Sequence, residues 1–233
     1  MIEISVIKFG TLSIESGELL QDDLYEAGKN LGKLGDSSVI HIKFEDQHYL
    51  VDTGFANEAI LTRENFVFNE KDLQSRLNLQ SLNFEDIMGV FITHWHADHF
   101  ANLRLFPKAK IYCFNPENEN YSSLARRYGF KKLLPIISLN IKDEFAGCQL
   151  FPTPGHTRLH CSLLANFQNF KVVIAGDAIV SQSYYDHDKV WPYNAGQLGE
   201  VESKQAMHRI IEVADYIIPG HGHPFQNYRR NKL

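Results

Sequence analysis

Short apolar runs alternate with turn residues and with stretches of helical spacing along the chain. Runs of strand length lie near residues 2–9, 38–44, 47–51, 88–93, 110–113, 147–151, 161–166, 171–175 and 215–218. Helical spacing occurs near residues 70–80, 99–105, 118–128 and 200–213. The pair Gln47-His48, between two apolar runs, predicts a hairpin turn. Because no long linker rich in Pro, Gly or Ser interrupts this alternation, we expect a single domain over residues 1–233.

Composition narrows the class of protein. With 44% apolar residues in 233, the chain can bury a sizeable core. No run of about eighteen apolar residues occurs, so no membrane span is expected. The first residues read as a strand with no basic segment before it, so we expect no signal peptide. The odd number of cysteines, Cys113, Cys148 and Cys161, each in an apolar setting, predicts buried inert thiols and a cytoplasmic location.

The segment His94-Trp95-His96-Ala97-Asp98-His99 carries the strongest chemical signal. It places three imidazoles and one carboxylate within six residues, directly after the apolar run 89–93. An isolated histidine is usually a surface residue or a satisfied core residue, but a cluster beside an aspartate is not. Neutral imidazole and ionised carboxylate suit a borderline-soft divalent cation such as zinc. The cluster therefore predicts a metal site at the end of a strand.

Three later segments repeat the order of apolar run, tight turn and metal-ligand residue. The ligand residues are His156, Asp177 and His221, and a Pro-Gly pair precedes both histidines. Because strand ends can meet at one edge of a sheet, we expect these side chains to join the first cluster. The full candidate set then holds five histidines and two aspartates and no thiolate.

Together these residues resemble the metallo-β-lactamase superfamily, whose His-x-His-x-Asp-His motif is joined by a later His, Asp and His. The resemblance implies an αββα four-layer sandwich, an α+β fold in which two mixed sheets are flanked by helices. It also implies that Asp52 supports the site from behind without binding metal. The runs 102–107 and 214–225 resemble one group within the superfamily, metallo-β-lactamase domain-containing protein 1, which includes a protein linked to RNA cleavage.

The resemblance also implies a role for each ligand. His94, His96 and His156 would hold a first metal ion, Asp98, His99 and His221 a second, and Asp177 would bridge them. Two metal ions about 3.5–4 Å apart share a hydroxide and lower the pKa of bound water from about 15.7 toward 7. Asp98 would orient this hydroxide and then protonate the leaving group. Zinc suits the ligand set best, and Mn, Fe and Co stay open.

The substrate must be inferred from other segments. Residues 181–193 follow Asp177 closely and are rich in aromatic side chains, which either line a pocket or pin the loop to the core. Tyr184 or Tyr185 is a candidate donor to a developing oxyanion, as in lactonase relatives. For residues 10–36, rich in Gly and acids, we expect a loop near the mouth of the site. We therefore expect a hydrolase acting on a small ester, thioester or lactone.

A metal-dependent phosphodiesterase or ribonuclease is the alternative. The net charge of −5 gives no general attraction to phosphates. The runs 126–132 and 228–232 combine basic and aromatic residues, but such runs are more often solvated surface. Nucleic acid is thus a possible partner that the sequence does not favour, and the sequence does not specify an oligomeric state.

Overall fold

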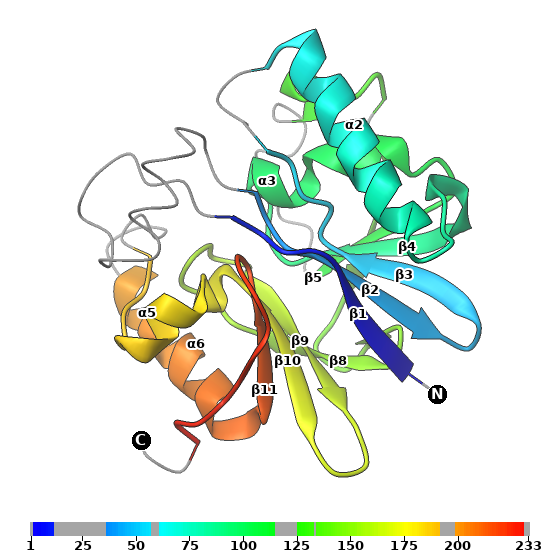
Figure 1. The fold of residues 1–233 in the computed structure, drawn as a ribbon. Helices are drawn as coiled ribbons and strands as arrows, with labels where there is room; N and C mark the ends of the chain where they lie inside the picture. The colour runs from blue at the N-terminus through cyan, green and yellow to red at the C-terminus, as the bar shows by residue number, and fades with distance from the viewer. Residues whose placement is uncertain are drawn as a thin grey trace.

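Two six-stranded mixed sheets lie at the centre of the molecule (Figure 1). The computed structural model describes residues 2–11, 36–56, 61–114, 125–132, 134–191 and 199–230. The first sheet has, in spatial order, β1 (Ile2–Lys8), β2 (Val39–Phe44), β3 (Gln47–Val51), β4 (Ile87–Ile92), β5 (Lys110–Phe114) and β6 (Ile136–Leu139). The second has β12 (Phe225–Gln226), β11 (Tyr216–Pro219), β10 (Lys171–Gly176), β9 (Cys161–Asn166), β8 (Cys148–Pro152) and β7 (Glu144–Phe145).

Parallel pairing directs the functional strands toward one edge. β3, β4 and β5 run parallel in the first sheet, and β10 and β11 run parallel in the second. The carboxyl ends of parallel neighbours necessarily lie at the same edge of their sheet. The loops that carry polar residues after β3, β4, β10 and β11 therefore start close to one another.

Helices cover the outer face of each sheet (Figure 1). On the first sheet they are α2 (Arg63–Asn78) and α3 (Ala97–Phe100), and on the second α5 (Gln182–Asp186) and α6 (Gly199–Val213). Three apolar clusters fill the spaces between the layers: one under α2 and α3, one between the sheets and one under α5 and α6. This is the αββα sandwich expected from the sequence. No helix in the described part of the chain is long and apolar enough to cross a membrane.

Several element boundaries differ from the sequence expectation. The hairpin turn lies at Glu45 and Asp46, whose φ angles are 50° and 59°, and not at Gln47-His48, which begin β3. Helix α2 starts at Arg63 rather than near residue 70, because the Thr62 hydroxyl caps it by accepting a bond from the Asn65 N–H at 3.3 Å.

Short elements account for the other differences. The strands β6, β7 and β12 and the helix α5 have only two to five residues each, too few to produce a clear periodic pattern. The helix expected over 99–105 is α3 followed by the 3₁₀ helix η2 (Ala101–Leu105). Two further 3₁₀ helices are η1 (Phe84–Asp86) and η3 (Asp177–Ile179). Most of the helix expected over 118–128, and residues 12–35 of the expected 10–36 loop, lie outside the described residues.

Candidate metal centre

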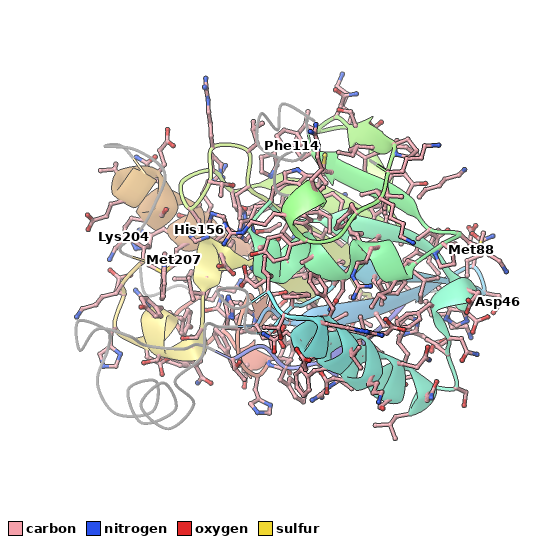
Figure 2. All side chains as sticks on the ribbon, turned by 90° about the horizontal axis from the view of Figure 1, so that it is seen from above. Asp46, Met88, Phe114, His156, Lys204 and Met207 are labelled. Atoms are coloured by element: carbon pink, nitrogen blue, oxygen red, sulfur yellow. The ribbon has the colours of Figure 1, made fainter. Side chains whose placement is uncertain are left out.

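The seven expected ligands come together where strands of the two sheets end. In the first half of the chain, His94 and His96 follow β4, and Asp98 and His99 lie in the one-turn helix α3. In the second half, His156 follows β8, Asp177 follows β10, and His221 follows β11. In Figure 2, His156 lies between the green elements of the first half of the chain and the yellow elements of the second. The site is thus assembled from both halves of the sandwich.

Four of these residues form a first group that could hold a metal ion: His94, His96, His156 and Asp177. The His96 Nδ1 atom lies 3.0 Å from His94 Nε2 and 3.0 Å from His156 Nε2. The Asp177 Oδ2 atom lies 3.3 Å from His156 Nε2. Three ring nitrogens and one carboxylate oxygen therefore face a common point.

Asp98, His99 and His221 form the second group. The Asp98 Oδ2 atom lies 3.5 Å from His99 Nε2 and 3.6 Å from His221 Nε2. All three side chains are largely buried, with Asp98 the most accessible at 12% exposure. A carboxylate and two imidazoles thus converge a short distance from the first group.

Asp177 connects the two groups through its two oxygens. While Oδ2 faces His156, Oδ1 lies 3.3 Å from His99 Nε2 and 3.4 Å from His221 Nε2. Both the Asp177 Oδ1 and His99 Nε2 atoms are buried and make no hydrogen bond. Leaving buried polar atoms unsatisfied is costly, and a cation between them would satisfy both lone pairs. The donor set and its geometry therefore fit divalent metal ions.

The surroundings orient three of the rings. Asp52 Oδ2 accepts a bond from His99 Nδ1 at 2.7 Å and one from the Thr93 hydroxyl at 2.8 Å. The Thr93 hydroxyl in turn accepts from His94 Nδ1 at 3.1 Å. His221 Nδ1 donates to the carbonyls of Thr11 and Asp36, both at 3.0 Å. Because each Nδ1 is held by one of these bonds, each Nε2 faces the site and is the atom that would bind a metal ion.

The electrostatics of the two groups differ. Burial, followed by the neighbouring imidazoles, lowers the pKa of His94 well below its usual value and that of His96 to about 3. These rings are neutral, as metal ligation requires. Burial also lowers the pKa of His221, but Asp177 and Asp98 outweigh it and raise the pKa to about 9. The second group therefore carries protons when no metal ion is bound, and a metal ion must displace them.

Two glycines allow the loops to approach the site. A Cβ atom on Gly220 would lie 1.9 Å from Asp177 Oδ1, so no other residue fits before His221. Gly155, before His156, has a φ of 138°, and a Cβ there would lie 2.1 Å from the Ser203 nitrogen. The two Pro-Gly-His segments thus need glycine for different reasons, one facing the site and the other packed on α6.

The two candidate tyrosines lie in the short helix α5. Tyr185 is fully buried under α6, where its hydroxyl donates to Asn227 Oδ1 at 2.7 Å and accepts from the Arg229 N–H at 2.9 Å. Both hydroxyl bonds are made with the C-terminal segment, so its position gives no support to the expected role in catalysis. Tyr184 is also buried, and its ring lies 5.9 Å from that of Trp191. Its role remains a prediction.

Two other polar residues lie close to the ligands: Thr93, for which the sequence predicts no role, and His160, which the sequence predicts to lie behind the ligands or at the surface without binding metal. Thr93 links His94 to Asp52, and its place directly before the histidine cluster was the only available signal. His160 is fully buried, donates to or accepts from the Thr153 hydroxyl at 2.8 Å, and its ring lies 5.0 Å from that of His94. It therefore packs behind the first group and belongs to neither group of candidate ligands.

The three cysteines and the aromatic residues of the first basic run are buried, and the arginines of the second run form ion pairs. All three cysteines are free and buried, and burial raises the pKa of Cys113 to about 11, as expected for inert thiols. In the basic run 126–132, Tyr128 and Phe130 are buried in the core under α3. At the C-terminus, Arg229 pairs with Asp188 at 2.7 Å and Arg230 pairs with Asp215.

Comparison with known proteins agrees with this geometry. The sequence profile of the metallo-beta-lactamase superfamily matches residues 32–221, which contain all seven candidate ligands. The chain belongs to this superfamily. Metallo-beta-lactamase domain-containing protein 1 of Xenopus laevis is 34% identical over 164 residues, which are 69% of this chain and 64% of that protein. The chain therefore spans a little under two thirds of the length of this relative.

Solved structures of this superfamily share the fold at low sequence identity. A Staphylococcus aureus protein described as a probable metal-dependent hydrolase has a TM-score of 0.73 at 17% identity, over 99% of this chain and 94% of that one. An N-acyl homoserine lactone hydrolase with its product bound at the catalytic metal centre has a TM-score of 0.67 at 18% identity, over 94% and 92%. These structures show the shared fold, and the chain combines this fold with a candidate metal-binding cluster.

Proposed function

We propose that the chain binds two divalent metal ions, with zinc as the first candidate, and hydrolyses a small ester, thioester or lactone. His94, His96 and His156 would hold the first ion, Asp98, His99 and His221 the second, and Asp177 would contact both. The observation that carries the proposal is the position of Asp177, whose two oxygens face different groups of ligands. A structural zinc site is normally closed by four ligands and needs no such shared carboxylate.

Metal ions at these positions would supply a nucleophile at neutral pH by lowering the pKa of water, and would stabilise negative charge on the substrate. The remaining tasks belong to the side chains. Asp98 is the most accessible carboxylate of the site, and burial raises its pKa. It is therefore suited to hold a proton and to deliver it to the leaving oxygen or sulfur. Asp52, behind His99, keeps the ring oriented throughout.

Two observations support a small substrate with an acyl carbon. Buried Tyr184 lies in α5, the helix that follows the 3₁₀ helix starting at Asp177, and its ring lies 5.9 Å from that of half-buried Trp191. A lactone hydrolase is among the structures that share the fold over nearly the whole chain. A Tyr184 hydroxyl near the site would donate to the developing oxyanion.

The described basic runs offer little support for a ribonuclease. Stacking on single-stranded RNA requires exposed aromatic faces, whereas Tyr128 and Phe130 in the first run are 3% and 7% exposed. In the second run Tyr228 is 49% exposed, but its hydroxyl donates to Asp186 and its ring packs edge-on against Tyr185. Arg229 and Arg230 are already paired with aspartates. Phosphodiester cleavage is therefore the alternative outcome of the test and not a second proposal.

A substrate panel tests the proposal. Protein loaded with zinc or manganese is offered lactones, thioesters, phosphodiesters and short RNA, with Asp177→Ala as the control that removes the shared ligand. We expect turnover of an acyl substrate that Asp177→Ala abolishes. Cleavage of only RNA or phosphodiesters would replace the proposed substrate class, and activity that persists in Asp177→Ala would contradict the shared role of this residue.

A further inference from the structure

His221 is held by two chain segments far from it in sequence. Its Nδ1 donates to the carbonyls of Thr11 and Asp36, at 3.0 Å each. Thr11 and Asp36 also bond to each other through their backbones, at 2.7 and 2.9 Å. The Ser38 N–H donates to the Gly220 carbonyl at 2.7 Å, directly before His221. The orientation of the His221 ring therefore depends on where Asp36 lies.

A buried ion pair fixes Asp36. Lys8, at the end of β1, pairs with the Asp36 carboxylate, and its ammonium also lies 2.6 Å from Asp72 Oδ2 in α2. The side chains of Lys8 and Asp36 are only 8% and 4% exposed. On its other side, the Asp36 carboxylate lies against Gly54, where a Cβ atom would come within 2.8 Å of Oδ1. Asp36 is thus held between Lys8 and the β3–α2 connection.

Stability alone does not account for this pair. Burying a lysine and a carboxylate costs desolvation energy that their attraction often fails to recover, and apolar replacements are frequently as stable. The pairing of β1 with β2 also shifts register between Val6 and Lys8, so the strand is irregular where Lys8 lies. Lys8 thus lies at an irregular strand end, and a buried ion pair joins it to Asp36, whose carbonyl orients His221.

We propose that Lys8 and Asp36 are positioning residues for the second metal ion. Their ion pair sets the position of the Asp36 carbonyl and through it directs His221 Nε2 toward Asp98 and Asp177. This inference rests on the proposed function, because it needs a second metal ion. Among the described residues, Lys8 and Asp36 make no hydrogen bond or ion pair with His94, His96 or His156. The inference therefore predicts that breaking the pair weakens binding of the second ion and leaves binding of the first unchanged.

Stepwise titration of the metal-free full chain with zinc, and with cobalt(II) as a spectroscopic probe, tests this inference. His221→Ala identifies the second step as the one that it removes. Lys8→Met is expected to weaken that step by about 10-fold, within the range for groups that orient metal ligands. Asp36→Asn keeps the backbone carbonyl and side-chain size, and is expected to weaken the same step by about 3-fold or more, a smaller loss than the roughly 10- to 100-fold typical of groups that bond directly to a metal ligand. Asp72→Asn is the matched control, since it removes a partner of Lys8 but keeps the pair with Asp36.

The outcomes separate the two proposals. A wild-type chain that binds fewer than two ions contradicts the proposed function itself. If the wild type binds two ions, then an unchanged second step in Asp36→Asn, an equal loss in both steps, or an equal loss in Asp72→Asn overturns the positioning role alone. If Lys8→Met does not fold, Asp36→Asn decides by itself. A shift in the cobalt spectrum confined to the second step supports the inference.

Discussion

The Asp52 carboxylate lies behind the candidate metal site and accepts a hydrogen bond from His99 Nδ1 at 2.7 Å. Asp52 is 2% exposed and has a φ of 57°, a backbone region that non-glycine residues seldom adopt. Strained conformations of this kind persist when the surroundings demand them. Here the Asp52 carboxylate accepts three hydrogen bonds, from the Thr93 N–H, the Thr93 hydroxyl and His99.

Asp52→Asn should therefore weaken metal binding without removing any ligand. The amide would point a donor at a donor in at least one of these bonds, so His99 would lose its orientation. We expect the affinity of the second ion to fall by about 10- to 100-fold. Asp46→Asn is the control, because that side chain is 97% exposed at the far end of the sheet (Figure 2). Equal metal affinities for Asp52→Asn and wild type would contradict the proposed supporting role of Asp52.

Asp98→Asn tests the proton role. The amide can still contact a metal ion through its oxygen, but it cannot deliver a proton. We expect kcat to fall by about 10²- to 10⁴-fold, while the melting temperature stays close to that of the wild type. Near-normal turnover by the loaded variant would show that another group, or water, protonates the leaving group.

Gly220→Ala should disrupt the shared carboxylate. The added methyl group would lie 1.9 Å from Asp177 Oδ1, so Asp177 must move away from the second group. We expect the loss of one metal ion per chain. Gly222→Ala is the control: it meets no atom within 4 Å, and because its φ is 97° it costs only backbone strain, about 1–2 kcal/mol. Two ions in both variants would contradict the tight approach of Gly220.

His41 predicts an acid-sensitive contribution to stability away from the metal site. It is buried beside Ser5 and His48, and burial, then His48, lowers its pKa to about 4. Between pH 6.5 and 4 the unfolded chain binds a proton that the folded chain does not, so stability falls as the pH drops through this window. Between pH 7.5 and pH 5, titration of this residue is expected to lower the free energy of unfolding by about 2 kcal/mol.

Urea unfolding of wild type and His41→Gln at both pH values measures this contribution. The variant should lose about 2 kcal/mol less than the wild type, because titrating groups that do not contact His41 cancel in the difference. His223→Gln serves as the control, because it changes an exposed ring whose centroid lies 4.2 Å from that of Phe9. The same pH dependence in wild type and His41→Gln would show that His41 titrates normally.

Tyr185→Phe and Tyr184→Phe should separate the two tyrosines. Removing the Tyr185 hydroxyl takes away one of two donors to buried Asn227 Oδ1, and the Arg229 N–H at 3.2 Å remains. We therefore expect a loss of stability of about 0.5–1.5 kcal/mol, with kcat unchanged. Tyr184→Phe should lower kcat on the acyl substrate if its hydroxyl reaches the oxyanion. A large loss of kcat in Tyr185→Phe at normal stability would restore that residue to the site.

The sequence predicts which seven side chains come together because their signal is local. Each ligand follows an apolar strand and a turn residue, and the cluster around His96 needs no long-range information. The supporting contacts carry no such signal: Lys8 and Asp36 are joined across a long connection, and His221 meets Thr11 from the other end of the chain. Adjacent helical residues point about 100° apart, so the sequence could not say which of Tyr184 and Tyr185 faces the core. Only packing under α6 decides it for Tyr185.

The number of metal ions per chain tests the central claim most directly. Elemental analysis of the purified chain, reloaded with zinc and freed of excess metal, should give two zinc ions for the wild type and one for His221→Ala. The first group lacks His221, so it should keep its ion in the variant. One ion in both proteins would contradict the binuclear centre.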